Sequence, residues 1–322
     1  MTGYQPLASI IILTKNAQDY LSELLNILKN QVANFNYEII VIDSASKDDT
    51  QKIATQKNVI LHTIDPKTFN HGGTRNEAIK LAKGKYIAFL TQDALPSSIN
   101  WLQSMISPFL KIDKLAGVFG KHIPRPDCNP LVARDIIGHF ENLYNNQESI
   151  NEIKGGETPQ QIERLRFYSN VNSCLNREIW QKIPFPVANY CEDQIWAEKV
   201  LKAGYKTVYS PEAAVYHSHS FPFLEAFRRY YDEYLGLYDA FGVMPGKSLI
   251  KSILRAIKTG FKDLNYLLKN PDLSIGKKIK YILYSPVFNL SRQIAAHLAY
   301  RNRNKQSKWN SKLSRDKYIK EA

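Results

Sequence analysis

Short apolar runs alternate with helical patterns through the first 120 residues, and this alternation limits the fold more than any other feature. Residues 8–14 (ASIIILT) and 37–42 (YEIIVI) are almost continuously apolar, which is typical of strands covered on both faces. Between them, residues 18–31 carry leucines at helical spacing. Such alternation predicts right-handed βαβ units and a mostly parallel, Rossmann-like α/β sheet. Further strands are expected at residues 59–63, 85–90 and 115–120, and further helices at 48–56, 73–83 and 101–110.

The pattern is less regular beyond residue 120. A helix is expected over residues 191–203, and short strands at 206–209 and 213–217 on either side of a Ser-Pro pair. Residues 145–159 are polar and contain Gly-Gly, which predicts a loop. The sequence therefore predicts a second half with longer irregular segments than the first.

Strand patterns end at Phe221, and the charge changes soon afterwards. Residues 246–322 contain 18 Lys and Arg against 4 Asp and Glu, whereas residues 1–245 contain 25 and 26. The net charge of +13 therefore belongs almost wholly to the last quarter of the chain. We expect an α/β domain over residues 1–220 and a basic helical region over residues 221–322.

The C-terminal region carries a strongly amphipathic helical pattern. The first such pattern lies within residues 247–264. A second, residues 277–284, is expected to end at Pro286. Residues 301–320 form a basic, polar tail. Six apolar residues of the first pattern fall within about 100° of arc on a helix: Ile250, Ile253, Leu254, Ile257, Phe261 and Leu264. Five cations cluster beside them: Lys247, Lys251, Arg255, Lys258 and Lys262.

Three interpretations of this basic region remain open. A lysine-rich amphipathic helix suits adsorption on an anionic membrane surface, to which each cation near the surface contributes about 1 kcal/mol. A basic stretch also suits nucleic-acid binding, but no recognisable nucleic-acid module is present. A charge-rich helical extension packed on the catalytic domain or on a second subunit is the third. We expect membrane association, and no nucleic-acid partner.

Several classes of protein are excluded by simple features of the chain. The three cysteines, Cys128, Cys174 and Cys191, form no CxxC pair, so neither a disulfide framework nor a cysteine-only zinc site is expected. The expected environment of the protein is a reducing cytosol. The N-terminus lacks the pattern of a signal peptide, and no apolar run reaches the length of a spanning helix. The glycine motifs of dinucleotide-binding Rossmann domains and P-loop NTPases are absent.

Polar residues follow four successive predicted strands, at the edge where ligands bind in open parallel sheets. Asp43 can accept a hydrogen bond from a base or a ribose hydroxyl. The Gly72-Gly73 pair lets helix amides approach a phosphate, and Arg75 adds positive charge. Asp93 can hold a divalent cation that bridges a diphosphate. Each residue alone also suits a turn or a helix cap, but four such loops together favour a nucleotide site.

The sequence motifs of these loops resemble those of a known family. IIILTKN, EIIVIDSASKDDT, FNHGGTRNEA and KYIAFLTQDALP, followed by NSCL, YCEDQIW and VYHSH, resemble inverting family 2 glycosyltransferases with a GT-A fold. FNHGGTRN and LTQDALP are similar to the bacterial rhamnosyltransferase branch of that family. The resemblance covers about residues 7–220. It implies a glycosyltransferase that moves L-rhamnose from dTDP-L-rhamnose to a glycan or lipid-linked glycan acceptor, in cell-surface polysaccharide synthesis.

The resemblance also implies a set of site residues. Thr91 stands where the family's Asp-x-Asp motif has its first aspartate, so Asp93 alone supplies a charged metal ligand there. His217 and His219 are the candidates for further ligands of a divalent cation, Mg²⁺ or Mn²⁺, although either histidine could simply cap the strand. Residues expected at the nucleotide and the donor are Thr14, Asn16, Asp43, Ser46, Arg75, Asn76 and Gln92.

Inverting transfer requires a general base opposite the leaving group. The resemblance assigns this role to Asp193, with Glu192 orienting or contacting the acceptor. Taken alone, a Glu-Asp pair at a helix start is also a favourable helix terminus. A transferase that uses a UDP-hexose and a non-catalytic nucleotide- or glycan-binding scaffold remain alternatives. The expected location is cytoplasmic, on the inner face of the cell membrane. The sequence specifies neither the identity of the acceptor nor whether the chain forms a homo-oligomer.

Overall fold

The computed structural model describes residues 5–188, 190–304 and 312–315. The chain divides into two compact units. The first contains residues 1–125 and 137–217, and the second contains residues 126–136 and 218–322. Helix α5 (Pro130–Tyr144) begins in the second unit and ends in the first.

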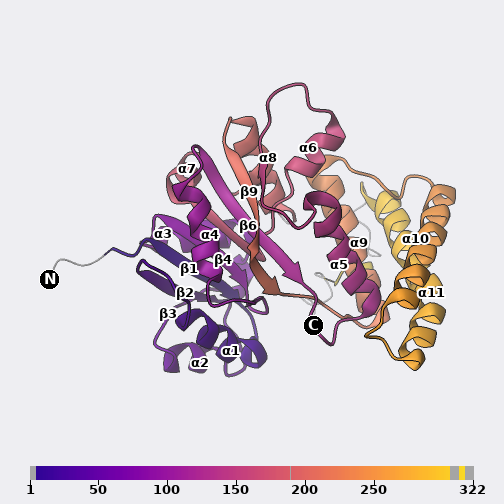
Figure 1. The fold of residues 1–322 in the computed structure, drawn as a ribbon, viewed down its shortest axis with the longest axis horizontal. Coiled ribbons are helices and arrows are strands. Elements are labelled where there is room, and N and C mark those ends of the chain that lie inside the picture. The colour runs from indigo at the N-terminus through magenta and orange to yellow at the C-terminus, as the bar shows by residue number, and fades with distance from the viewer. Residues whose placement is uncertain (1–4, 189, 305–311, 316–322) are drawn as a thin grey trace. The chain divides into compact units, whose positions relative to one another are not determined.

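The first unit is built on one mixed sheet (Figure 1). Its strands run in the order β3-β2-β1-β4-β8-β6-β9-β5, with β7 beside β9. The strands are β1 (Ala8–Thr14), β2 (Tyr37–Asp43), β3 (Ile60–Thr63), β4 (Tyr86–Thr91), β5 (Leu95–Pro96), β6 (Leu115–Ile123), β7 (Ser149–Asn151), β8 (Asn172–Asn176) and β9 (Lys206–Tyr216). Its helices are α1 (Gln18–Lys29), α2 (Thr50–Gln56), α3 (His71–Leu81), α4 (Trp101–Ile106), α6 (Pro159–Leu165), α7 (Arg177–Lys182) and α8 (Glu192–Lys202), with short 3₁₀ turns at Pro66–Thr68 and Ser107–Leu110.

Strand directions bring many loops to one edge of the sheet. Strands β1, β2, β3 and β4 are parallel, and β8 is antiparallel to both β4 and β6. Strand β6 therefore runs with β4, and β9 is parallel to β6. The carboxyl ends of six strands and the start of β8 consequently lie at the same edge, which is where ligands bind in open α/β sheets.

The apolar strand runs are buried on both faces, as their sequences predict. Ile10 and Ile12 of β1 pack with the leucines of α1 and with Trp101 of α4 in one core cluster. Ile11, which points to the opposite face, is also fully buried. A period-two strand with both faces covered has no solvent-exposed side, so its sequence shows no alternation.

The second unit consists of helices. Helices α10 (Leu249–Lys269) and α11 (Ile275–Asn302) lie side by side, and α11 also packs on α9 (Phe223–Phe241) (Figure 1). Two apolar clusters hold these helices together, one around Leu267 and Phe288 and one around Tyr231 and Ala295. No helix in the described part of the chain has the length and apolar character that crossing a membrane requires. The helices are α9 (Phe223–Phe241), α10 (Leu249–Lys269) and α11 (Ile275–Asn302), together with the start of α5.

Three local predictions were wrong. Helix α11 does not end at Pro286 but continues to Asn302, because buried residues beyond the proline pack on the neighbouring helices. Residues 206–216 form one strand rather than two, since the irregularity is absorbed by a shift in the pairing with β6. The polar segment at 145–159 contains strand β7, which pairs with β9. Most of the basic tail at 301–320 lies outside the described residues.

Candidate active site

The loops after β1 and β2 are joined through the carboxylate of Asp43, which is fully buried. Thr14 donates its hydroxyl to Asp43 Oδ1 at 3.0 Å, and the backbone amide of Ser46 donates to Oδ2 at 2.9 Å. The Ser46 hydroxyl and the side-chain amide of Gln51 also donate to this carboxylate. Both oxygens of Asp43 are therefore occupied by protein donors, and Asp43 fixes the positions of Thr14 and Ser46 at the edge of the sheet.

The loop after β1 is also joined to the loops after β4 and β2. The backbone amide of Lys15 donates to Gln92 Oε1 at 2.8 Å, and the Gln92 amide donates back to the Lys15 carbonyl at 3.2 Å. The backbone amide of Asn16 donates to the Ser46 hydroxyl at 2.8 Å. Asn16 and Ala45 both have left-handed backbone angles, with φ of 50°. Strained loop residues of this kind gather at functional sites.

Asp93, His217 and His219 form the candidate metal cluster. Asp93 follows β4, and its Oδ2 lies 3.6 Å from Nε2 of His217, which follows β9. One potential ligand atom from each of the three residues lies within 4.8 Å of the others. Arg125, which follows β6, donates to the backbone carbonyl of Asp93 at 2.5 Å and stacks on Tyr20. The sequence had given no signal for Arg125, because it stands between two prolines in an irregular segment.

The donor set of this cluster fits a divalent cation. Ligands about 2.1 Å from an octahedral ion are about 3 to 4.2 Å apart, so ligand atoms within 4.8 Å need only small side-chain adjustments. A carboxylate and imidazoles together suit Mn²⁺ better than Mg²⁺, which prefers oxygen ligands.

His122 is a further histidine beside this cluster, and no sequence pattern points to it. It lies near the end of β6, and its ring is 5.5 Å from that of His217. Burial, followed by the nearby His217 and His139, holds the pKa of His122 well below its usual value. Its buried Nε2 has no hydrogen-bond partner among the described residues. His122 is therefore a neutral imidazole packed against a candidate metal ligand.

Helix α3 is linked to α8 by a buried ion pair. Arg75 Nη1 lies 2.9 Å from Glu192 Oε1, and both side chains are almost fully buried. Arg75 therefore faces Glu192 in this structure. Its neighbour Asn76 is engaged with Trp180 and with both backbone groups of Phe185. The amide of Gly73 donates to the side chain of Asn70, which caps α3.

Asp193 lies in the first turn of α8, directly after Cys191 and Glu192. The backbone amide of Asn170 donates to Asp193 Oδ2 at 3.0 Å, and the amide of Gln194 donates to Oδ1 at 2.8 Å. Burial of the carboxylate, followed by repulsion from Glu192, raises the pKa of Asp193 to about 7. Cys191, which precedes the helix, has a left-handed φ of 57°. This carboxyl is therefore balanced between its acid and base forms near neutral pH.

A short backbone path links Asp193 to the strand that leads to Asp93. The amide of Thr91, at the end of β4, donates to the carbonyl of Val171 at 3.2 Å. Val171 follows Asn170, whose amide holds Asp193. Asp93 and Asp193 thus lie at the same edge of the sheet, although 100 residues separate them in the sequence. Asn170 had no sequence signal, because only pairing between β4 and the segment before β8 brings it here.

Among the predicted site residues, Asp193 is held at the start of α8 by the backbone amide of Asn170. The others fall into two groups. Arg75, Asn76 and Glu192 are buried or engaged between α3, α7 and the start of α8. The second group lies at the carboxyl edge of the sheet, at strand ends or in the loops that follow them: Thr14, Asn16, Asp43, Ser46, Gln92, Asp93 and His217. His219 joins the second group through the candidate metal cluster.

Comparisons with known proteins agree with this arrangement. The model of the glycosyl transferase family 2 matches residues 9–169. The O-antigen chain rhamnosyltransferase RfbN of Salmonella typhimurium is 36% identical over 228 residues, 70% of each chain. The O-antigen chain rhamnosyltransferase WbaN of Salmonella anatum is 35% identical over 198 residues, 61% of each chain.

A solved structure shares the fold. The mannosyltransferase PcManGT from Pyrobaculum calidifontis, in complex with GDP-Man and Mn²⁺, has a TM-score of 0.57 at 14% identity, over 94% of this chain and 88% of that one. The GT-A fold with a helical C-terminal region, expected from the sequence, is thereby confirmed. The family model, the Salmonella relatives and the converging strand ends lead to one conclusion: this chain is a glycosyltransferase and belongs to family 2.

Proposed function

We propose that the enzyme transfers L-rhamnose, with inversion, from dTDP-L-rhamnose to a hydroxyl of a glycan or lipid-linked glycan in cell-surface polysaccharide synthesis, on the cytoplasmic side of the membrane. The sugar and the pathway are supported by the rhamnosyltransferase names of two relatives at 35–36% identity. The reaction type is supported above all by the common position of Asp93 and Asp193 at one edge of the sheet.

Asp193 is assigned the role of general base. As the acceptor oxygen attacks the anomeric carbon, its proton passes to the Asp193 carboxylate. The new glycosidic bond forms while the bond between the anomeric carbon and the phosphate oxygen breaks, and its electron pair leaves with dTDP. A base works best when its pKa lies near the working pH, and the pKa of about 7 for Asp193 meets this condition.

Glu192 and Arg75 are assigned a positioning role. Glu192 Oε1 accepts from Arg75 and, at 3.2 Å, from the side-chain amide of Asn170. Asn170 in turn holds Asp193 through its backbone amide. The buried pair therefore fixes both the start of α8 and the residue that orients the base.

Donor binding is assigned to the loops after β1, β2 and β4. Four residues at these strand ends and loops are assigned to contact the donor: Thr14, Asn16, Ser46 and Gln92. Two further residues, Asp43 and Asn76, hold their neighbours in place. We assign the metal to Asp93, His217 and His219. A divalent cation, Mn²⁺ in preference to Mg²⁺, would supply positive charge to the departing diphosphate.

The donor can be identified by binding measurements on the full-length enzyme. We expect dTDP-L-rhamnose to raise Tm more than dTDP alone, and Mn²⁺ to increase both shifts. UDP-glucose and UDP-N-acetylglucosamine test the UDP-hexose alternative. A larger shift with a UDP-hexose than with dTDP-L-rhamnose would reject the rhamnosyl assignment. NMR of the product's anomeric proton then tests inversion, since a retained configuration is incompatible with single displacement.

A further inference from the structure

Helix α10 exposes an apolar face along its whole length of about 30 Å. The most exposed members are Ile250 (72%), Phe261 (67%) and Leu268 (59%). Soluble chains expose single apolar side chains routinely, but a continuous face indicates a binding surface. The apolar face of α10 consists of Leu249, Ile250, Ile253, Leu254, Ile257, Phe261, Leu264 and Leu268.

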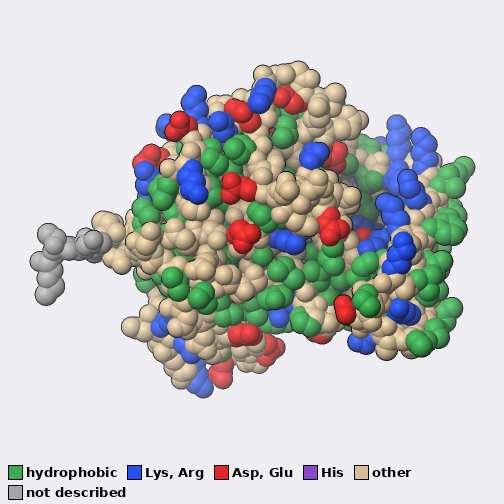
Figure 2. Space-filling view, in the orientation of Figure 1, with side chains coloured by type: hydrophobic (Ala, Val, Ile, Leu, Met, Phe, Trp, Pro, Cys, Tyr) green, Lys and Arg blue, Asp and Glu red, His purple; other side chains and the backbone are tan. Residues whose placement is uncertain are grey.

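Helix α11 exposes a second apolar stripe beside the first. Its residues recur at intervals of three or four, so they lie on one side of the helix. Figure 2 shows hydrophobic side chains together with lysine and arginine over the α10–α11 part of the molecule. The α11 stripe consists of Ile275, Ile279, Leu283, Val287, Leu290 and Ile294.

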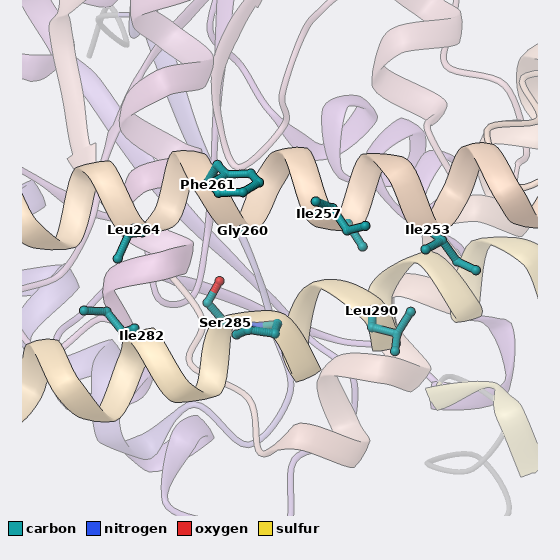
Figure 3. Close-up of a pocket in the computed structure, with 10 residues that line it drawn as sticks. Ile253, Ile257, Gly260, Phe261, Leu264, Ile282, Ser285 and Leu290 are labelled. Carbon is teal, nitrogen blue, oxygen red and sulfur yellow. The ribbon is translucent and has the colours of Figure 1, made fainter.

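A groove of about 420 Å³ joins the two stripes (Figure 3). Small residues of both helices, Ala256, Gly260 and Ser285, are among those that line it. The larger side chains of the lining belong to the exposed faces or lie next to them: Ile253, Ile257, Phe261, Leu264, Ile282 and Leu290. The two helices therefore offer one apolar surface with a groove along it. We refer to it as the α10–α11 face.

The opposite sides of the two helices are fixed by a buried polar network. Asp263 accepts hydrogen bonds from Ser285 at 2.5 Å and from Asn289 at 2.6 Å, and it is paired with Arg134 of α5 at 3.0 Å. Arg134 and Arg292 both contact Asp135. A buried carboxylate with these partners cannot turn outward without leaving charges unpaired. The network thus holds the α10–α11 face toward the exterior of this unit.

Cations flank this face on one side. Helical geometry places them in an arc next to the exposed apolar arc of α10, and they are exposed. Asp263 is the single acidic residue in α10 and α11, and it is buried. The surface thus combines apolar area with positive charge. The flanking cations are Lys251, Arg255, Lys258, Lys262 and Lys269.

We propose that the α10–α11 face docks on an anionic lipid bilayer, with both helices lying in the interface and lipid acyl chains filling the groove. Apolar contact and attraction between cations and lipid phosphates act together in such docking. A second copy of this chain is a poorer occupant, because it would bring the same cations to a face with no exposed acid to pair with them.

Vesicle flotation of the full-length protein tests the proposal directly. We expect flotation with phosphatidylcholine vesicles that contain phosphatidylglycerol, and little with phosphatidylcholine alone. Replacing Ile250, Phe261 and Leu268 by Ser should weaken vesicle binding about 100-fold or more, since each position loses the apolar area that the native side chain would bury in the bilayer. The matched control replaces Ile99, Leu110 and Val187 by Ser, which are 58%, 65% and 79% exposed in the first unit. The control should float like the unaltered protein.

A second pair of variants tests the charges. Changing Lys251, Lys258 and Lys262 to Gln should weaken binding to anionic vesicles on the order of 100-fold, at about tenfold or less for each cation. The control changes Lys52, Lys80 and Lys202 to Gln, three exposed lysines of the first unit, and removes the same charge. An equal loss of vesicle binding in both variants would show that binding depends only on net charge. That result would overturn docking through the α10–α11 face.

Insertion and self-association give separate readouts. Phe261→Trp should be quenched by lipids that carry bromine on their acyl chains, and absence of quenching would overturn insertion of the groove. If light scattering shows a dimer that the serine variant disrupts while flotation is unchanged, the face is a subunit interface and the proposal is wrong. None of these measurements uses a sugar donor, so a wrong donor assignment does not affect their outcome.

Discussion

Arg75 and Glu192 form a buried ion pair at 2.9 Å, across 117 residues of sequence. The pair joins the second turn of α3 to the first turn of α8. Glu192 also repels the adjacent Asp193 carboxylate, whereas Arg75 attracts it, and the two influences act on the pKa of Asp193 in opposite directions. The proposed base is therefore tuned by a pair that is almost fully buried.

The rate of transfer should depend on pH through Asp193. The base must be ionised, so kcat/KM should rise with pH through about 7 and level off above it. A rate that stays constant between pH 5 and 8 would contradict the role of Asp193. The measurement is a pH–rate profile at saturating Mn²⁺, with donor binding followed in parallel so that loss of binding is not mistaken for loss of base.

Asp193→Asn should lower kcat by about 10² to 10⁴, the usual contribution of a general base, with little change in donor affinity. The same variant has a stability signature. Because the folded-state pKa of Asp193 is raised, its contribution to stability is lost as pH rises through about 7. Between pH 6 and 8, Tm of the natural protein should therefore fall more than Tm of the variant. Parallel Tm curves would show that this carboxyl ionises as an ordinary exposed group.

Glu192→Gln should move the acidic limb of the pH–rate profile to lower pH. The substitution removes the negative charge that raises the pKa of Asp193 and leaves the positive charge of Arg75. Breaking a buried pair also costs stability, so Tm should fall. Glu178→Gln, at a residue 70% exposed, removes the same charge elsewhere and should leave the profile in place. A shift to higher pH would refute the electrostatic account.

Metal binding should depend on Asp93 and His217. Asp93→Asn and His217→Ala should each weaken Mn²⁺ binding by about tenfold or more, which titration calorimetry can measure without substrate. The contact from Arg125 goes to the backbone carbonyl of Asp93, so Asp93→Asn leaves it intact. His62→Ala, on strand β3, is the control histidine. Unchanged Mn²⁺ affinity in both ligand variants would remove the cluster as the metal site.

Gly72→Ala should disturb the site through packing alone. An added Cβ would lie 2.0 Å from the carbonyl oxygen of Pro186 and 3.4 Å from Cβ of Glu192. The segment that leads into Glu192 and Asp193 would have to move, so both Tm and kcat should fall. Gly276→Ala is the control, because no atom lies within 4 Å of its added Cβ. Equal Tm and activity in both variants would mean that the segment yields at no cost.

Much of the fold could be predicted because its signals are local. Continuous apolar runs such as Ala8–Thr14 can be buried only on both faces, and strand patterns that alternate with helical patterns specify a parallel α/β sheet. Strand β8 was not predicted, since Asn172–Asn176 has neither an apolar run nor a clean alternation. Its burial depends on β4 and β6, which lie on either side of it.

The sequence by itself determined the alternation of strands and helices in the first 120 residues, the polar loops at the strand ends, and the amphipathic pattern of α10. These follow from residue periodicity within a few turns of chain. Only the tertiary structure decided that Asn170 holds Asp193 and that Arg75 pairs with Glu192. It also decided that the Asp43 carboxylate accepts hydrogen bonds from Thr14 and Ser46. Such contacts join distant segments, and they exist because strand pairing and helix packing bring those segments to one edge of the sheet.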